Sequence, residues 1–468
     1  MSDVVFPRTA DGQRSSSALG RAVVADALRA VDPAAAEAAS AEQDWRRGYL
    51  RHFRALVEAG VTARAGYAVA RAGLAAVQER MRARIDGEEV APAEALARPV
   101  DRPLRTITIE GAEKPEQELT LPYGKELLRG DALSRRLDAW VTAGTVEPSA
   151  AEAVRAVAAN PQWLDLGDLR PVILGAGAEM GPVPALLGWG ATVVGVDLPR
   201  PEVQARLART AERGAGRLVM PEAGADLLAD LPAVAQWLAG VEGRLVLGNY
   251  VYAPGAAYAR LSAAVDALTL DLGRRRPDTA FAFLATPTDV FAVPAEAVAQ
   301  ATERYRRRSR PARVTQRLSG RRLLRPNYPG GADPGIADSL VAQQGPNYAL
   351  AKRIQRWRAS VARQDGAVVS FAVAPPTNTR SVTNNRLLAA AYAGAHLFGV
   401  EVFAPATANK LMAILLVHQL RRPRPAAPQA WRDEAVAAAH GGLWRVAYQP
   451  RTALGLAALR GGLSRPPR

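Results

Sequence analysis

The sequence contains no cysteine, only four histidines and only four lysines. Without cysteine there can be no disulfide, no thiolate zinc site and no cysteine nucleophile. The histidines lie far apart and lack the spacing of metal ligands, which argues against a histidine-rich metal site. No apolar run reaches the ~18 residues of a membrane-spanning helix, and the first 18 residues do not resemble a secretion signal. We therefore expect a cytoplasmic protein without a membrane span.

Basic residues outnumber acidic ones, 60 to 45, and all but four of the basic residues are arginine. Such an excess can attract polyanions. However, arginine and alanine are abundant throughout the chain, which is more typical of a compositional bias. No helix-turn-helix or aromatic RNA-binding signature accompanies the charge, so we do not expect nucleic acid as a partner.

Helical patterns dominate the first part of the chain, where apolar residues recur at spacings of three and four. This part, residues 1–165, is predicted to be an α-rich N-terminal domain for packing, oligomerisation or substrate covering. A homo-oligomer is compatible with this interpretation. The expected helices are 18–31, 41–59, 67–84 and 125–154, with one strand at 105–109.

From residue 166 to about 420, short apolar runs alternate with helical segments, as in a parallel sheet covered on both faces. The predicted fold is α/β, with a Rossmann-type doubly wound parallel sheet. The expected strands are 171–174, 192–196, 217–220, 244–247, 280–284 and 367–373, and the helices between the early ones are 183–187, 201–213, 231–239 and 256–272. Asp266 and Asp271 in the last helix are interpreted as surface charges.

Two segments depart from this alternation. Residues 300–345 form an Arg/Gly/Pro-rich insertion, whose arginines could clamp a phosphate or carboxylate or could form a solvated basic loop. Residues 421–468 are read as a basic C-terminal tail that begins with helix-breaking prolines.

A glycine-rich turn, Gly175-Ala176-Gly177-Ala178-Glu179-Met180-Gly181, connects the first expected strand to a helix. Glycines allow close approach of a phosphate, and free amides at the helix start face the anion. Asp197 follows the next strand, 22 residues after Gly175, near the position of a carboxylate that binds ribose hydroxyls. The pattern predicts a bound dinucleotide. The carboxylate slightly favours NAD over NADP because it would repel a 2′-phosphate, while Arg200 leaves NADP open. S-adenosylmethionine fits the same pattern.

Tyr348 and Lys352 are four residues apart on an expected helix, so their side chains lie on one face. An ammonium group beside a phenol favours the phenolate and lowers the tyrosine pKa towards neutrality. Such a tyrosine can exchange a proton with a carbonyl/alcohol pair. This pair favours an oxidoreductase over a methyltransferase.

Together, these motifs make residues 171–420 resemble the short-chain dehydrogenase/reductase family. Residues 174–181 resemble its Thr-Gly-x-x-x-Gly-x-Gly turn, with Glu179 in place of the middle glycine, and Tyr348 and Lys352 match its Tyr-x-x-x-Lys pair. Asp226 resembles the aspartate that contacts adenine after the third strand. Asn249 falls where the family has Asn-Asn-Ala-Gly after the fourth strand. Residues 374–377 resemble its Pro-Gly segment.

The family's catalytic serine follows the fifth strand, where this chain has only Thr286 and Thr288. The resemblance implies that Tyr348 transfers the proton, that Lys352 binds the nicotinamide ribose, and that one threonine orients the substrate oxygen. It also implies that residues 382–396 and 400–418 form a wall of the substrate pocket. An apolar wall beside an arginine-rich segment suits an apolar small molecule that carries an acid or phosphate.

Three functions therefore remain open from the sequence. The first is an NAD(P)-dependent dehydrogenase or reductase of this type. The second is an S-adenosylmethionine-dependent methyltransferase, which gives the Tyr348/Lys352 pair no purpose. The third is a non-catalytic Rossmann protein that senses a ligand or supports an assembly.

Overall fold

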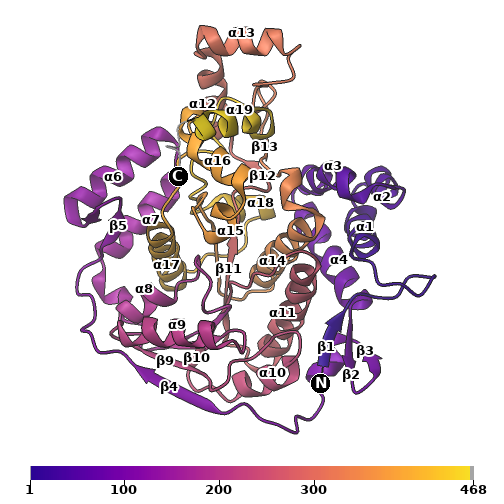
Figure 1. Ribbon diagram of the computed structural model, residues 1–468, viewed down its shortest axis with the longest axis vertical. Helices are drawn as coiled ribbons and strands as arrows, with labels where there is room; N and C mark the ends of the chain where they lie inside the picture. The colour runs from indigo at the N-terminus through magenta and orange to yellow at the C-terminus, as the bar shows by residue number, and fades with distance from the viewer. Residues whose placement is uncertain (1, 464–468) are drawn as a thin grey trace.

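The computed structural model describes residues 2–463 and is built around a seven-stranded, mostly parallel sheet (Figure 1). All six predicted central strands are present, which confirms the α/β class. They are β7 (Leu169–Leu174), β8 (Thr192–Val196), β9 (Arg217–Pro221), β10 (Arg244–Asn249), β11 (Ala280–Ala285) and β14 (Val369–Val373). The seventh, β4 (Thr106–Glu110), comes from the N-terminal region and pairs antiparallel with β9 at the edge.

The parallel strands run in the order β9-β8-β7-β10-β11-β14. The first of these parallel strands in the chain, β7, lies in the middle of the sheet. The next two, β8 and β9, extend the sheet to one side, and β10, β11 and β14 extend it to the other. The carboxyl ends of β7 and β10, which lie side by side, mark the point where this direction reverses. In open α/β sheets, a crevice for ligands opens at such a point.

Both faces of the sheet are buried, which explains why the strands read as continuous apolar runs. Alternate residues of β7 enter different cores: Val172 and Leu174 face one core, and Ile173 faces the other. The first core contains α10 (Leu231–Ala239), α11 (Ala256–Arg275) and α14 (Pro346–Gln364). The second contains α7 (Pro148–Ala158), α8 (Val183–Gly188), α9 (Pro201–Glu212) and α17 (Pro405–Arg421).

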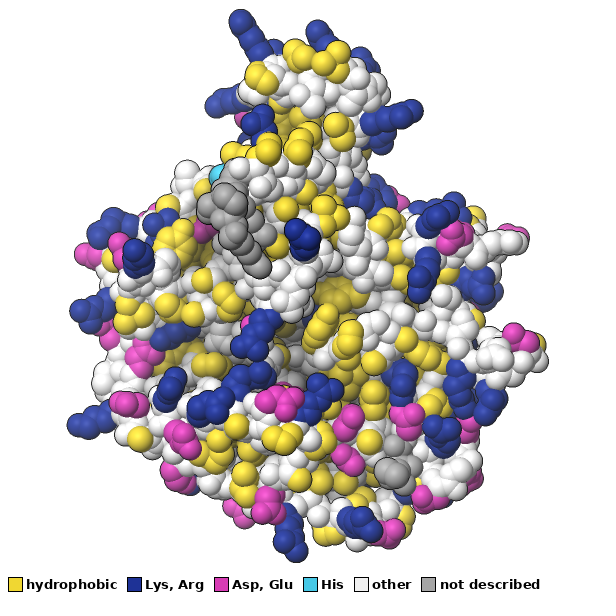
Figure 2. All heavy atoms as spheres, in the orientation of Figure 1, with side chains coloured by type: hydrophobic (Ala, Val, Ile, Leu, Met, Phe, Trp, Pro, Cys, Tyr) yellow, Lys and Arg dark blue, Asp and Glu magenta, His cyan; other side chains and the backbone are white. Residues whose placement is uncertain are grey.

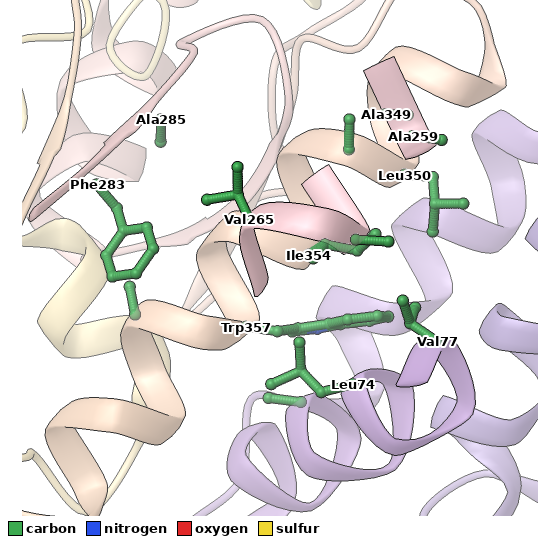
Figure 3. Close-up of a cluster of buried hydrophobic side chains, with 14 of the residues drawn as sticks. Leu74, Val77, Ala259, Val265, Phe283, Ala285, Ala349, Leu350, Ile354 and Trp357 are labelled. Atoms are coloured by element: carbon green, nitrogen blue, oxygen red, sulfur yellow. The ribbon is translucent and has the colours of Figure 1, made fainter. Parts of the chain in front are cut away.

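The N-terminal helices pack directly onto the outside of the first layer. They are α1 (Ser16–Arg29), α2 (Pro33–Ser40), α3 (Trp45–Ala59) and α4 (Ala65–Arg80), beside a small sheet of β1 (Ser2–Val5), β2 (Arg82–Ile85) and β3 (Glu88–Val90). Trp357 of α14 lies between the layers, against Leu74 and Val77 of α4 (Figure 3). Gly73 permits this approach, because a Cβ there would come within 2.3 Å of the Trp357 ring.

Several N-terminal predictions were wrong in extent. The segment expected as one helix at 125–154 contains the strand β6 (Glu126–Leu128), which pairs with β5 (Leu121–Tyr123), and then α6 (Gly130–Ala143) and α7. The break arises because Gly144 adopts a left-handed conformation, with φ 64°, and ends α6. The helix expected at 67–84 ends at Arg80 because Met81 is extended and leads into β2.

The interpretation of Asp266 and Asp271 as surface charges was also wrong. Asp266 is buried and forms an ion pair of 2.6 Å with Arg358 of α14, and Asp271 is buried beside Arg275. Asp266 joins α11 to α14, whereas Asp271 pairs within α11, and both carboxylates face away from bulk solvent.

The predicted insertion, residues 300–345, overlaps a segment that begins and ends with a strand. β12 (Val290–Val293) pairs antiparallel with β13 (Gly335–Asp338), and between them lie α12 (Ala295–Arg306) and α13 (Arg310–Leu318). Several elements follow β14: short α15 (Arg380–Thr383), α16 (Arg386–Gly394), η3 (Ala395–Phe398), α17, α18 (Ala430–Ala435) and α19 (Pro450–Leu463). The 421–463 part is structured, and Trp444 in it is fully buried. Across residues 2–463, no helix combines the length and apolarity needed to cross a bilayer.

A buried carboxylate ties this C-terminal part to α7. Glu147 binds the Arg445 guanidinium through both oxygens, at 2.7 Å each, and lies 2.9 Å from His440 Nε2. Burial alone would raise the pKa of Glu147, but hydrogen bonds and charge from Arg445 and His440 lower it to about 2.

We predict that Glu147→Gln lowers the free energy of unfolding by about 3 kcal/mol at neutral pH. This is the free-energy equivalent of lowering the carboxyl pKa from 4.5 to about 2. A depressed carboxyl pKa stabilises the fold above the unfolded pKa and loses that effect as the pH falls. Urea unfolding at several pH values should therefore show the full difference at pH 7, shrinking between about pH 4.5 and 2. A difference independent of pH would contradict this account.

Candidate functional site

The glycine-rich turn lies at the carboxyl end of β7, as predicted, where the sheet order reverses. Gly175 has φ 78°, and a Cβ there would come within 2.9 Å of the Tyr250 carbonyl oxygen. Only glycine fits both the conformation and the neighbouring backbone of the β10 end. The turn continues through Gly177 and Gly181 into α8, which is a short helix of six residues.

Two backbone amides of this turn are available to a ligand. Within residues 2–463, the N–H groups of Glu179 and Met180 have no hydrogen-bond acceptor. The Gly177 N–H, by contrast, donates to the Asp197 carboxylate at 2.6 Å. A phosphate at this edge would therefore meet the amides of Glu179 and Met180, because the Gly177 amide is already engaged.

Asp197 stands at the end of β8, half-buried against the turn. Its other oxygen accepts a hydrogen bond from the Leu198 N–H at 2.8 Å. Arg206 of α9 donates to the Gly177 carbonyl at 3.0 Å, so the turn is held from both sides. Each carboxylate oxygen keeps a second lone pair, so Asp197 can still accept a bond from a ribose hydroxyl.

Segments that follow β14 lie over the turn. The Arg380 N–H donates to the Glu179 carboxylate at 2.8 Å, and the Arg380 guanidinium is 3.4 Å from it. From α17, the Asn409 side-chain amide donates to the Gly181 carbonyl. The Asn409 contact connects residues 400–418 of the predicted pocket wall to the glycine turn, and Arg380 lies just before the other wall segment, residues 382–396.

Asp226 and Asn249 take different positions at the same edge. Asp226 is half-buried after β9 and accepts a hydrogen bond from the Leu228 N–H at 2.9 Å. Asn249 is the last residue of β10 and lies between β7 and β11. It is only 4% exposed, and among the described residues its Oδ1 has no hydrogen-bond partner. An orphaned acceptor at this point fits an edge built to receive a polar ligand.

Three predicted catalytic residues meet at the carboxyl end of β11. Tyr348 is in the first turn of α14, and Thr286 acts on its phenol by lowering the pKa of the hydroxyl. Lys352 lies one turn further along α14, and its charge acts on the Tyr348 phenol. The Lys352 ammonium donates to the Leu284 carbonyl in β11 at 3.1 Å. Thr286 and Tyr348 are 62 positions apart in the chain, and the whole insertion lies between them.

A second hydroxyl and an amide extend this cluster. Thr288 Oγ1 lies 2.9 Å from Thr286 Oγ1, and Gln344 Nε2 donates to Thr288 Oγ1 at 2.9 Å. Because the amide nitrogen can only donate, the Thr288 hydroxyl is free to donate to Thr286, and the Thr286 hydroxyl keeps its own proton to donate. Of the two threonines, Thr286 is the one that affects the pKa of the Tyr348 phenol, and Thr288 supports it.

The net effect on the Tyr348 pKa differs from the prediction. Burial raises the pKa of this phenol above its usual range, and this effect outweighs the lowering by Lys352 and Thr286. Burial also lowers the pKa of the Lys352 ammonium. The expected shift towards neutrality was wrong because helical spacing shows the nearby charge but not the loss of water. Tyr348 is thus protonated at neutral pH and suited to donate a proton.

Aromatic side chains flank Tyr348. The Tyr258 ring of α11 packs on Tyr348 with centroids 5.5 Å apart, and Tyr392 of α16 raises the pKa of the same phenol. Gln355, one turn after Lys352, binds both the Lys352 ammonium and the Tyr258 hydroxyl. The sequence analysis did not identify Gln344, Gln355, Tyr258 or Tyr392. Helical spacing could have indicated the first two, because Gln344 is four residues before Tyr348 and Gln355 is three residues after Lys352.

The turn and the hydroxyl cluster share one edge. β10 separates β7 from β11, so the end of β7 is two strand spacings, about 10 Å, from the end of β11. Elsewhere, a groove of about 550 Å³ lies at the amino ends of the strands, beside Arg170, Thr192 and Arg217. No candidate site residue lines that groove.

No protein-family model matches the chain, and no curated protein sequence matches it.

Proposed function

We propose that the chain is an NAD(P)-dependent oxidoreductase of the short-chain dehydrogenase/reductase type, with a Rossmann-type dinucleotide site at the carboxyl edge of its sheet. The observation that carries the proposal is the meeting of Thr286, Tyr348 and Lys352 beside the end of β11. These three side chains are the set needed to protonate and orient a carbonyl oxygen.

The strand order supports a dinucleotide at this edge. Counted from β7, the parallel strands lie in the order 3-2-1-4-5-6, which is that of dinucleotide-binding doubly wound sheets. The glycine turn follows strand 1 and Asp197 follows strand 2, as in that fold. The hydroxyl cluster follows strand 5 on the other side of the reversal.

The residues at the edge fit a dinucleotide. The amides of Glu179 and Met180 would hold the pyrophosphate, and Asp197 would accept bonds from the adenosine ribose. Gly175, Gly177 and Gly181 shape the turn. In a second group, Asp226 would contact adenine, Asn249 would offer its orphaned oxygen, and Lys352 would reach the nicotinamide ribose. The bound nicotinamide supplies the hydride donor or acceptor.

The chain's own residues perform the proton transfer. In reduction, the Tyr348 hydroxyl donates its proton to the substrate oxygen. Thr286 donates a hydrogen bond into the same centre and is held by Thr288 and Gln344. Lys352 stabilises the phenolate that remains, and the Tyr258 ring packs against it. The substrate is a carbonyl or alcohol that fits beside these aromatic side chains, and an apolar molecule with an acidic group suits the arginine-rich surroundings.

A methyl donor at the same turn would give Thr286, Tyr348 and Lys352 no chemical task, so the methyltransferase alternative is disfavoured. A decisive assay follows NADH and NADPH absorbance with a panel of aldehydes, ketones and thioesters, beside a radiolabelled methyl-transfer assay. Carbonyl-dependent oxidation of either cofactor supports the proposal. Methyl transfer without cofactor oxidation would refute it.

The raised Tyr348 pKa predicts opposite pH profiles for the two directions. Reduction needs the protonated phenol, which persists through neutral pH, so kcat for reduction should stay flat between about pH 6 and 9. Oxidation needs the phenolate, so its rate should rise about tenfold per pH unit over the same range. Initial rates in both directions check this, and an oxidation rate that levels off near pH 7 would contradict the burial argument.

A further inference from the structure

The α12–α13 insertion projects from the body as a separate arm, with α13 at its tip (Figure 1). Residues 304–332 contain ten arginines and no aspartate or glutamate. The net charge of the whole chain is +15, so this short stretch carries most of the excess. The overall composition suggested a chain-wide bias, but much of the excess lies here, even though Arg306 and Arg307 pair with Glu303 just before the stretch. We call residues 304–332 the arginine arm.

The tip helix α13 is oriented with its apolar side outward. The residues that face the body are small or polar, such as Ala312, Thr315 and Gln316, which are partly covered. Val314 and Leu318, one turn apart, are 53% and 84% exposed. α13 has no buried residue at all. An amphipathic helix normally turns its apolar side inward, so this side lacks the partner that it would usually have.

Arginines lie directly beside the exposed apolar side chains. At 100° per residue, Arg310, Arg313 and Arg317 form the sector next to Val314 and Leu318. All three are exposed, and within residues 2–463 none of them forms an ion pair. Figure 2 shows this combination, with basic and hydrophobic side chains together on the projecting tip.

The arm is held firmly at its base. Gln316 binds the Tyr305 hydroxyl and the Leu324 carbonyl, at 2.7 and 2.8 Å from its amide nitrogen. Backbone N–H groups of Leu324 and Arg325 donate to Thr452 in α19. The outward position of Val314 and Leu318 is therefore set by the fold.

We propose that the arginine arm docks the protein onto an anionic lipid surface, with the arginines among the headgroups and Val314 and Leu318 inserted at the acyl boundary. Both the arginines and the apolar side chains would stabilise binding to a bilayer interface, because anionic headgroups attract the cations and the acyl region receives the apolar side chains. A nucleic acid would interact with the arginines alone, since α13 carries no aromatic side chain for base stacking. The arm leaves the body after Thr286 and returns before Tyr348, so docking places the lipid beside the carboxyl edge of the sheet.

The test is flotation of the purified full chain with phosphatidylcholine vesicles, with and without phosphatidylglycerol. We expect binding only to the anionic vesicles, weakening as salt rises. Arg313→Gln with Arg317→Gln, and separately Val314→Ser with Leu318→Ser, should each lower the partition coefficient at least about tenfold. Because α13 buries no side chain, both variants should keep the melting temperature of the parent.

Matched controls lie elsewhere on the surface. Arg46→Gln with Arg47→Gln removes two exposed arginines of α3, and Leu127→Ser removes an exposed leucine. Both should bind vesicles as the parent does. Absence of binding to anionic vesicles, or equal loss in the controls, would overturn the proposal. So would tighter binding to a labelled oligonucleotide that the arginine variants abolish and the Val314/Leu318 variant leaves intact.

Discussion

Replacing Tyr348 with phenylalanine should lower kcat for carbonyl reduction by about 10²- to 10⁴-fold, the usual contribution of a positioned proton donor. The substitution removes one hydroxyl from a ring that packs against Tyr258 and leaves the ring in place. Cofactor affinity should therefore change less than about threefold. Steady-state kinetics and cofactor titration on the same preparation measure both quantities.

Tyr258→Phe is the matched control. Tyr258 is a buried tyrosine beside Tyr348, and its hydroxyl accepts a hydrogen bond from Gln355. We expect this variant to keep kcat within about tenfold of the parent. Equal loss in both variants would show that the tyrosines contribute packing, and unchanged kcat in Tyr348→Phe would remove Tyr348 from the mechanism.

Replacing Asp289 with asparagine should lower the free energy of unfolding by about 3–5 kcal/mol, the cost of breaking a buried ion pair from one side. Asp289 is 2% exposed and accepts hydrogen bonds from Arg353 at 3.2 Å and Arg356 at 2.6 Å. Burial would raise the pKa of Asp289, but the two guanidinium charges hold it below its usual range. The asparagine would leave Arg353 without a charged partner, while Arg356 would keep Glu434.

Denaturant unfolding of Asp289→Asn and of Asp278→Asn measures the effect. Asp278 is exposed and its carboxylate lies 3.8 Å from the Arg276 guanidinium, so its replacement should change stability by less than about 0.5 kcal/mol. Asp289 follows Thr288 directly, and its network also fixes α14, so we expect kcat to fall in the folded variant. If both variants unfold at the same denaturant concentration, the buried network does not hold this edge together.

The sequence was a good guide to the central sheet and a poor one to its additions. The six parallel strands could be located because each is buried on both faces and reads as a short apolar run. β12 and β13 were missed because their pairing joins residues some 45 positions apart across the arginine arm. β4 was expected as a strand, but nothing local shows that it joins the edge of the main sheet.

The candidate site was partly accessible from local patterns. Helical spacing placed Tyr348 and Lys352 together, and the position after strand 5 narrowed the hydroxyl to Thr286 or Thr288. Only the folded chain distinguishes these threonines, because Thr288 turns towards Gln344. The net rise of the Tyr348 pKa and the engagement of Asp197 by the turn depend on burial and backbone direction, which a linear motif does not contain.

Calorimetric titration with NADH and NADPH tests the dinucleotide site most directly. We predict saturable binding of at least one cofactor, weakened at least about tenfold by Asp197→Ala, which removes the carboxylate from the turn. Glu242→Ala, an exposed carboxylate before β10 at the opposite edge of the sheet, should bind as the parent does. No binding of either cofactor to the folded parent, or equal binding by Asp197→Ala, would contradict the account.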